Sequence, residues 1–340
     1  GSGLGLTLNS TAGSTSLFGT KSYTGTTFVK GNAYLYTTDA ATNATFNTTF
    51  NISSGGQVIL NTAMNAGVGI TVTGDISGAG NLTLPFYSST TQPTLNLQGK
   101  LLLTGTTNVT NATLVLSNSR DYTIASNFTG NSAGKLTVAG TGNLTLTGNS
   151  TGFTGKLNIN TGSNVTLGDG VTSGIVSAAS IANNGTLNFN RSDNVTVSSV
   201  ISGSGTLNKL GSNVLTLSGA NTFTGNITIQ QGTLKAITSS TALGNNVGVA
   251  ISDVAGAGLE IGVSGITLGS LSGGASASVN VSTNNLTVGT NNATTTYSGT
   301  LVGSGSLIKT GTGTLTLPGN HSTFTGTFNV SDGTEVFTNT

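Results

Sequence analysis

Few side chains in this sequence have the chemistry of a catalytic or metal-binding group. His321 is the only histidine, and none of the 340 residues is a cysteine. A catalytic triad or a metal site needs partner side chains around the imidazole, and no such partner is evident near His321. We therefore expect this histidine to be a solvated loop residue. The lack of cysteine excludes disulfides and thiolate–metal sites.

The acidic residues are few and widely spaced. Glycosidases need two carboxylates held ~5–10 Å apart across a cleft. Acids this far apart in sequence would converge only if the fold stacked them on one face, so a polysaccharide-acting enzyme stays open as an alternative. We predict no catalytic, cofactor-binding or metal-binding residues. The acids are Asp39, Asp75, Asp121, Asp169, Asp193, Asp253, Glu260, Asp332 and Glu335.

Two local charge pairs lie in the sequence, Arg120 with Asp121 and Arg191 with Asp193. We expect both on the surface, where an ion pair contributes at most ~1 kcal/mol. The Asn-x-Ser/Thr tripeptide of N-glycosylation also recurs, as at Asn143. Asparagine, serine and threonine are so common here that chance produces many such matches, so glycosylation stays open.

The composition narrows the class of protein. Charged residues make up 6% of the chain, with 10 Lys+Arg against 9 Asp+Glu, whereas a soluble domain usually has about 25%. So few cations cannot release many counterions, which argues against nucleic-acid binding. Hydrophobic residues still make up 35%, so we expect a folded chain. The first ten residues show no signal peptide, so either one was removed or the chain is a segment of a longer protein.

Short strands are the elements available to position these residues. Alternation of Leu, Val or Ile with Thr has the period of a strand, and only 172–184 and 238–250 would accommodate a single helical turn. The Gly-Ser-Gly steps at 203–205 and 303–305 lack the Lys-Ser/Thr of a phosphate loop, so we expect corners there. The chain is therefore predicted to be all-β. The clearest runs are NLTLPF (81–86), NVTL (164–167), VLTLSG (214–219) and TLTLPG (314–319).

Internal repeats predict how these strands are arranged. The segment ISGSGTLNKLGSNVLTLSG at 201–219 returns as LVGSGSLIKTGTGTLTLPG at 301–319. Each copy then reaches an aromatic residue, Phe223 or Phe324, and a third copy has Phe153 at this point. A unit of this size cannot enclose a core alone, but stacked units can. The clearest copies span residues 142–168, 201–237 and 301–337.

The simplest arrangement is a parallel β-solenoid with coils of roughly 20–25 residues. With strands about 4.8 Å apart, roughly 14 to 16 coils would form one continuous rod over residues 1–340, about 70 Å long. Inward Leu, Val, Ile and Phe would stack into a dry core, while outward Thr and Asn would form ladders of like side chains. Stacked like charges would repel, which would explain why Lys and Glu are scarce.

The segment 203–236 resembles the autotransporter-associated β-strand repeat, found in passenger domains of Gram-negative type V secreted proteins. The copy at 301–337 fits this pattern too but departs after Gly333, where Thr334, Glu335 and Val336 replace a leucine step. The resemblance implies a right-handed parallel β-helix, carried to the cell surface by an outer-membrane β-barrel translocator outside this chain. The pattern residues are Gly203, Gly205, Leu207, Lys209, Gly211, Leu215, Leu217, Gly219, Asn221, Thr222, Phe223, Thr224, Gly225, Gly232 and Leu234.

Together these features predict a non-enzymatic, rigid stalk or passenger segment without cofactors. We expect it to be located in the extracellular space or on the cell surface of a Gram-negative bacterium and to act in adhesion or display. Its partners would be a host-cell, sibling-cell or matrix surface, and not nucleic acid. The alternative is a self-assembling filament or surface-layer subunit, because solenoid ends have unpaired strand edges that favour end-to-end association.

Overall fold

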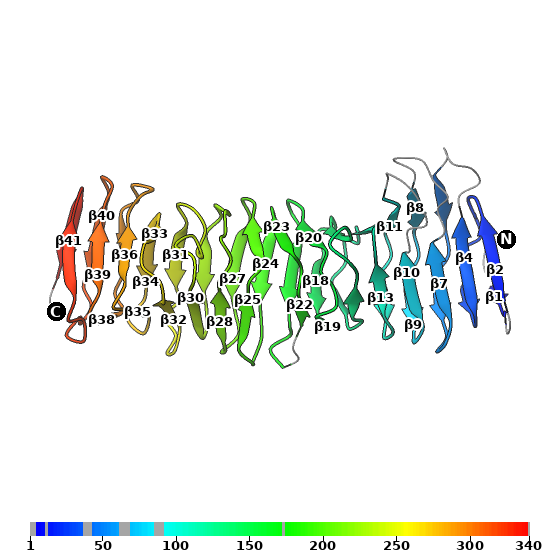
Figure 1. The fold of residues 1–340 in the computed structure, drawn as a ribbon, viewed down its shortest axis with the longest axis horizontal. Coiled ribbons are helices and arrows are strands. Elements are labelled where there is room, and N and C mark those ends of the chain that lie inside the picture. The colour runs from blue at the N-terminus through cyan, green and yellow to red at the C-terminus, as the bar shows by residue number, and fades with distance from the viewer. Residues whose placement is uncertain are drawn as a thin grey trace. The chain divides into compact units, whose positions relative to one another are not determined.

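The fold is given by a computed structural model, which describes residues 5–10, 13–36, 43–60, 69–84, 92–171 and 174–338. In these ranges the chain consists of β-strands joined by turns and bends, without a helix (Figure 1). The all-β prediction is therefore confirmed. The helical turn allowed in 238–250 is a hydrogen-bonded turn, in which the Ala242 amide donates to the Ser239 carbonyl (3.0 Å) and a strand follows. Among the described residues, no helix has the length and apolar character needed to cross a bilayer.

The chain forms two compact units. Unit 1 contains Gly1–Leu167 and Gly174–Ser180, and unit 2 contains Gly168–Ser173 and Ile181–Thr340. The prediction of one continuous solenoid over residues 1–340 stays a prediction.

Unit 1 contains several parallel sheets, and within each sheet neighbouring strands come from successive coils. The first sheet consists of β1 (Leu6–Leu8), β3 (Thr27–Val29), β6 (Phe50–Ile52), β9 (Ile76–Gly78) and β12 (Leu101–Leu103). The second consists of β2 (Ser14–Phe18), β4 (Asn32–Tyr36), β7 (Gln57–Leu60), β10 (Asn81–Leu84), β13 (Thr107–Val109) and β16 (Phe128–Thr129). The third contains β5 (Ala44–Phe46), β8 (Gly69–Val72), β11 (Thr94–Leu97), β14 (Thr113–Leu116), β17 (Lys135–Val138) and β20 (Lys156–Ile159). Shorter sets are β15 (Tyr122–Ile124), β18 (Asn143–Leu146) and β21 (Asn164–Leu167), and β19 (Asn149–Ser150) with β22 (Ile175–Val176).

Unit 2 is built in the same way. One sheet contains β24 (Thr186–Phe189), β27 (Thr206–Lys209), β29 (Ile227–Ile229), β31 (Gly248–Ile251) and β34 (Ser270–Gly273). A second consists of β25 (Val195–Val197), β28 (Val214–Leu217), β30 (Thr233–Ala236), β32 (Gly258–Ile261), β35 (Ser278–Ser282) and β38 (Thr300–Gly303). The others are β33 (Ile266–Leu268), β36 (Asn285–Val288), β39 (Ser306–Lys309) and β41 (Thr327–Val330), then β37 (Thr295–Thr296), β40 (Thr314–Leu317) and β42 (Thr334–Phe337), and β26 (Val200–Ser202) beside β23 (Ser180–Asn183).

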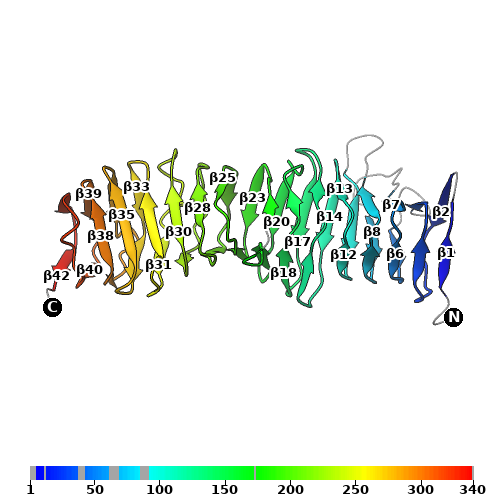
Figure 2. The same ribbon diagram turned by 90° about the horizontal axis from the view of Figure 1, so that it is seen from below.

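The order of pairing shows how the chain winds. In unit 1, β6, β7 and β8 lie in three different sheets, and the next strand, β9, returns to pair in parallel with β6, so that Phe50 faces Ile76. In unit 2, β27, β29 and β31 likewise pair in parallel one coil after another (Figures 1 and 2). The parallel β-solenoid prediction is confirmed in each unit. Right-handed winding stays a prediction.

The core lies inside the coils and is aliphatic. In β28, Leu215 and Leu217 are buried while Val214 and Thr216 alternate with them on the outer face. Leu215 stacks on Leu234 of the next coil, so equivalent leucines contact one another along the unit. This is the inward column that the alternating sequence predicts, since successive strand residues point to opposite faces.

The outer faces contain the predicted ladders of like side chains. The Asn208 Nδ2 donates to the Asn188 Oδ1 across one coil (2.8 Å) in unit 2, and the Asn164 Nδ2 donates to the Asn143 Oδ1 (2.7 Å) in unit 1. The ladders thus satisfy amide groups that would otherwise bind water.

One outer position departs from the expected avoidance of stacked like charges. Lys135 of β17 and Lys156 of β20 are direct register partners. Neither lysine is buried, so both remain solvated, and screening by water and salt makes the repulsion small.

Candidate functional site

The repeated aromatic residue marks a corner where successive coils approach closely. Phe223 is 1% exposed, and two residues later Gly225 lies against the coil before it. A Cβ on Gly225 would overlap the carbonyl oxygen of Gly205. Glycine is required there because no side chain fits between the two backbones.

The same corner is present one hundred residues later and, modified, between the two. Phe324 is buried, and a Cβ on Gly326 would overlap the carbonyl of Gly305. Tyr297 takes the aromatic position in the intervening coil, where it is fully buried and its hydroxyl donates to the Thr300 carbonyl (2.9 Å). Burial raises the pKa of Tyr297, so its hydroxyl keeps its proton and its donor role.

Beside the aromatic corner of residue 223, a buried asparagine joins three coils. Asn221 is 0% exposed. Its Oδ1 accepts the Ile201 N–H (2.7 Å), and its Nδ2 donates to the Ala242 carbonyl (2.6 Å). The side chain thus replaces backbone hydrogen bonds that the ladder cannot form at this corner.

A lysine occupies the core at another corner. Lys209 is 0% exposed, between Phe189 and Ile229 in the stack. Its Nζ donates to the Gly211 carbonyl and, on the next coil, to the Gln231 carbonyl (3.0 Å). Burial lowers the pKa of Lys209 to about 8, because the apolar surroundings disfavour the ammonium.

Lys309 repeats this arrangement. It is 1% exposed, and its Nζ donates to the Thr310 (2.6 Å) and Gly311 (2.7 Å) carbonyls and to the Asp332 carbonyl of the next coil (3.4 Å). Each buried lysine therefore binds the carbonyl two residues ahead and a carbonyl on the following coil. The aromatic residue with its close-packed glycine and the buried lysine therefore recur at 209–225 and again at 309–326.

The model of the passenger-associated-transport-repeat matches the chain at residues 136–163, 207–236 and 307–334, and so covers these corners. This chain carries passenger-associated transport repeats. Such repeats are typical of autotransporter passenger domains, as the sequence resemblance predicts. No match to a curated protein or to a solved structure accompanies them.

The first passenger-associated transport repeat, 136–163, has an apolar residue at the position of the lysine. Its third residue is Val138, where the repeats beginning at 207 and 307 have Lys209 and Lys309. Val138 is 2% exposed and lies in the core like its counterparts. An apolar side chain therefore fits this position of the repeat.

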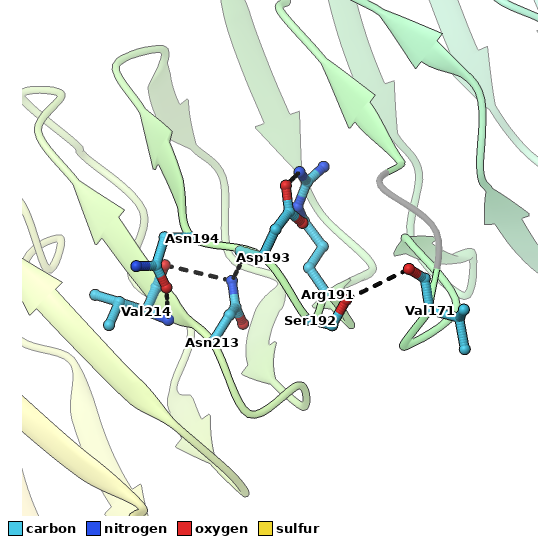
Figure 3. Close-up of polar contacts among 7 residues, drawn as sticks. All are labelled: Val171, Arg191, Ser192, Asp193, Asn194, Asn213 and Val214. Carbon is cyan, nitrogen blue, oxygen red and sulfur yellow. Dashed lines mark hydrogen bonds and ion pairs between the residues drawn. The ribbon is translucent and has the colours of Figure 1, made fainter.

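An ion pair lies just before the second repeat, in a corner shown in Figure 3. The Arg191 guanidinium and the Asp193 carboxylate approach within 2.5 Å. The Arg191 side chain is only 4% exposed and Asp193 is 54% exposed, so the prediction that both are on the surface is wrong for the arginine. The Asn213 Nδ2, one coil later, donates to the Asp193 carbonyl (2.6 Å) and connects the pair to the solenoid.

The other predicted charge pair does not form. Within the described residues, Arg120 makes no ion pair with Asp121. Asp121 instead accepts hydrogen bonds from the Asn143 N–H (2.7 Å) and Nδ2 (3.0 Å) on the next coil. These hydrogen bonds lower the pKa of Asp121, because they favour the carboxylate over the acid. The Asp121 carboxylate thus binds the amide groups of the next coil and not the guanidinium of its sequence neighbour.

His321 lies in the third repeat, and the expected solvated position is wrong. Its ring is half-buried, with 6.3 Å between its centroid and that of Phe328. Burial lowers the pKa of His321, and the Leu317 backbone opposes that shift. A hollow of about 380 Å³ beside it is lined in part by Phe328 and Phe337.

The remaining acids do not gather into a site among the described residues. No group of three His, Asp or Glu side chains in that part of the chain lies close enough together to hold a metal ion. Glu260 pairs with Lys235 (2.6 Å), and Asp253 accepts the Ser276 N–H (2.7 Å), which lowers the pKa of Asp253. Asp39 lies outside the described residues.

The sequence pattern missed the most unusual groups of these repeats, the buried lysines. Lys209 and Lys309 are among the residues of the family pattern, but a lysine is ordinarily expected on the outer face, and these two were not predicted to lie inside. The signal was their position within the alternation: each follows a leucine by two residues, as Lys209 follows Leu207, and so falls on the inner face.

Proposed function

We propose that this chain is a non-catalytic, rigid β-helical passenger segment of a secreted or surface-displayed bacterial protein, acting in adhesion or display. The observation that carries the proposal is the place of the passenger-associated transport repeats. Their characteristic Phe223, Gly225, Asn221 and Lys209 all serve contacts between coils. A repeat whose distinctive side chains face inward supports a scaffold and not a reactive centre.

The outer faces support a role in contact with a surface. They present Asn and Thr side chains in ladders, such as Asn188 with Asn208, and the chain as a whole has a net charge of only +1. A nearly neutral face rich in amides and hydroxyls suits broad contact with host cells, sibling cells or matrix. The repeats also imply an outer-membrane translocator as a partner during export.

A display experiment tests this function. The 340-residue chain is placed between an amino-terminal epitope and an outer-membrane translocator, and epitope exposure and cell–cell adhesion are measured on intact cells. We expect an exposed epitope and adhesion above that of a fusion without the chain. The variant Phe223→Asp, which places a charge in the core of the second repeat, should reduce both. If the epitope is accessible but adhesion does not increase, the role in display is supported and the role in adhesion is contradicted.

The two alternatives give different results in separate assays. A filament-forming subunit would produce concentration-dependent fibres in electron microscopy and sedimentation, whereas a passenger segment should sediment as isolated particles. A polysaccharide-acting enzyme would release reducing ends from acidic polysaccharides with or without Ca²⁺. We expect neither fibres nor release.

A further inference from the structure

The charges of this chain are distributed unevenly between its two units. Unit 1 has six Lys or Arg residues against three acids, whereas unit 2 has four against six. In unit 2, Lys209, Lys309 and Arg191 are buried, which leaves Lys235 outside. All six cations of unit 1 lie in the described ranges, and none of them is buried. The small net charge of the whole chain therefore conceals a basic outer surface on unit 1.

The excess of positive charge in unit 1 comes from its last coils. Residues 92–159 contain four cations and a single acid, Asp121. The Asp121 carboxylate accepts hydrogen bonds from Asn143, and within the described ranges none of the four cations is in an ion pair. Their charge is therefore not neutralised by a contact with a carboxylate. The four are Lys100, Arg120, Lys135 and Lys156.

Two of these cations lie face to face. Lys135, the first residue of β17, is the register partner of Lys156, the first residue of β20, and both side chains are on the outer face. Like charges directly opposite each other destabilise a sheet. The outer lysine of unit 2 is arranged in the opposite way, since Lys235 faces Glu260 of the next coil. An anion from outside would stabilise the lysine pair, because it would relieve the repulsion.

The outer face around the pair presents hydroxyl and amide groups. β14, β17 and β20 pair in parallel side by side (Figure 2), and a strand of four residues spans ~13 Å. Lys135 and Lys156 begin two of these strands, while Arg120 lies in the corner after β14, so cations flank both ends of the face. Between them the Asn158 Nδ2 donates to the Thr137 Oγ1 (3.3 Å).

We propose that the outer face of β14, β17 and β20 binds an acidic polysaccharide. Carboxylates or sulfates along the polymer contact the ammonium groups of Lys135 and Lys156 and the guanidinium of Arg120. Sugar hydroxyls form hydrogen bonds with Thr137 and Asn158. This inference rests on the proposed role in contact with a surface, and it names the chemistry of the partner.

The number of cations and the residues between them separate this ligand from other polyanions. Strong binding to nucleic acid takes about 6–10 phosphate contacts, more than this face supplies. Binding to an anionic membrane takes about 4–8 clustered Lys or Arg residues or an apolar face that enters the bilayer. The outward neighbours of the lysines are instead Thr113, Thr137 and Asn158. A few cations among hydroxyls and amides suit a polymer that has both acidic groups and hydroxyls.

A binding experiment tests the proposal with polygalacturonate, a polymer of carboxylated sugars, and with neutral dextran. The 340-residue chain is titrated with each polymer by isothermal titration calorimetry. We expect binding to polygalacturonate and not to dextran, and weaker binding at high salt, which screens exposed charges. The double variant Lys135→Gln with Lys156→Gln should raise the Kd for polygalacturonate ~5- to 30-fold, because two exposed charge contacts are lost.

The matched control is Lys30→Gln with Lys235→Gln. It lowers the net charge by the same amount, but Lys30 follows β3 and Lys235 faces Glu260, so both lie outside the proposed face. We expect its Kd to stay within ~2-fold of the parent. Both double variants should keep the thermal midpoint of the parent or exceed it, because the four lysines are on the outer surface. Lys156→Gln alone should raise the Kd ~2- to 5-fold and replaces the double variant if that protein does not fold.

Three results would overturn the proposal. One is polygalacturonate binding no stronger than dextran binding. Another is an equal rise of the Kd in the control, since the polymer would then respond to net charge and not to this face. The third is tighter binding to phosphatidylglycerol vesicles than to polygalacturonate, which would assign the face to a membrane. If the displayed chain promotes adhesion but does not bind polygalacturonate, only this inference fails; if it binds polygalacturonate but display produces no adhesion, only the adhesive role fails.

Discussion

Replacing Phe223 by alanine tests whether the repeat corner stabilises the solenoid locally. The ring is 1% exposed, and the surrounding backbone is fixed by three inter-coil hydrogen bonds, from the Thr222, Thr224 and Asn245 amides to the Ile201, Gly203 and Phe223 carbonyls. Truncating a fully buried phenylalanine costs ~3–5 kcal/mol, because the ring's contacts are lost and a cavity remains. In a stack whose coils contact only their neighbours, this loss should stay near the second repeat.

Hydrogen exchange measured by mass spectrometry resolves this effect along the chain. A loss of ~3–5 kcal/mol corresponds to roughly a 10²- to 4 × 10³-fold faster exchange of amides that open with the corner. We expect this increase in peptides covering residues 221–237. Peptides covering residues 143–167, in unit 1, should change little.

The matched control is Thr224→Ala in the same turn. Thr224 is exposed and its side chain adds little packing, so the variant should change stability by less than ~0.5 kcal/mol. The reasoning is refuted if Phe223→Ala exchanges like Thr224→Ala. It is also refuted if exchange rises equally in residues 143–167, because the corner would then not act locally.

Three further outcomes follow from the contacts described above. Gly225→Ala should lower the thermal midpoint measured by circular dichroism and the free energy of unfolding by ~1–3 kcal/mol, because its Cβ would overlap the Gly205 carbonyl. An unchanged midpoint would contradict the close approach. Burial raises the pKa of Glu335 to about 7, so its contribution to stability is full below ~pH 4.5 and is lost as the pH rises through 7. Glu335→Gln should remove this decline in urea denaturation series at pH 5 to 8. An identical decline in both proteins would disprove the assignment. Lys235→Ala should lower the free energy of unfolding by at most ~1 kcal/mol, because the ion pair of Lys235 with Glu260 is partly exposed. This loss of stability should shrink in 1 M salt, and a loss that salt does not change would rule out an electrostatic origin.

Much of the fold follows from local sequence. The runs at 164–167, 214–217 and 314–317 are strands where alternation predicts them, and NLTL at 81–84 is one as well; residues 85 and 86 of that run lie outside the described residues. Alternation suffices because the inner face of every coil is apolar and the outer face polar. The repeats at 201–237 and 301–337 then predict stacking, since one coil cannot bury its own face.

The polar groups were predicted less well. Asp121 was expected to pair with its neighbour Arg120, but it binds Asn143 of the next coil. Arg191 was expected on the surface and is buried. The first error arose because the partner of Asp121 lies one coil away in sequence, where no local pattern reveals it. The second arose because the burial of Arg191 depends on how the coils stack, although Arg191 keeps its sequence neighbour Asp193 as partner.

The amino-acid sequence by itself determined that this chain is all-β, that its strands stack as repeated parallel coils, and that it carries the residues of a passenger-type repeat. These properties depend on period-two alternation and on recurrence, both of which are written along the chain. Only the tertiary structure decided which polar side chains are buried at the corners, and what Lys209, Asn221 and Lys309 bind there. Their partners are carbonyl groups of other coils, and a carbonyl has no residue type, so its position becomes known only when the coils are stacked.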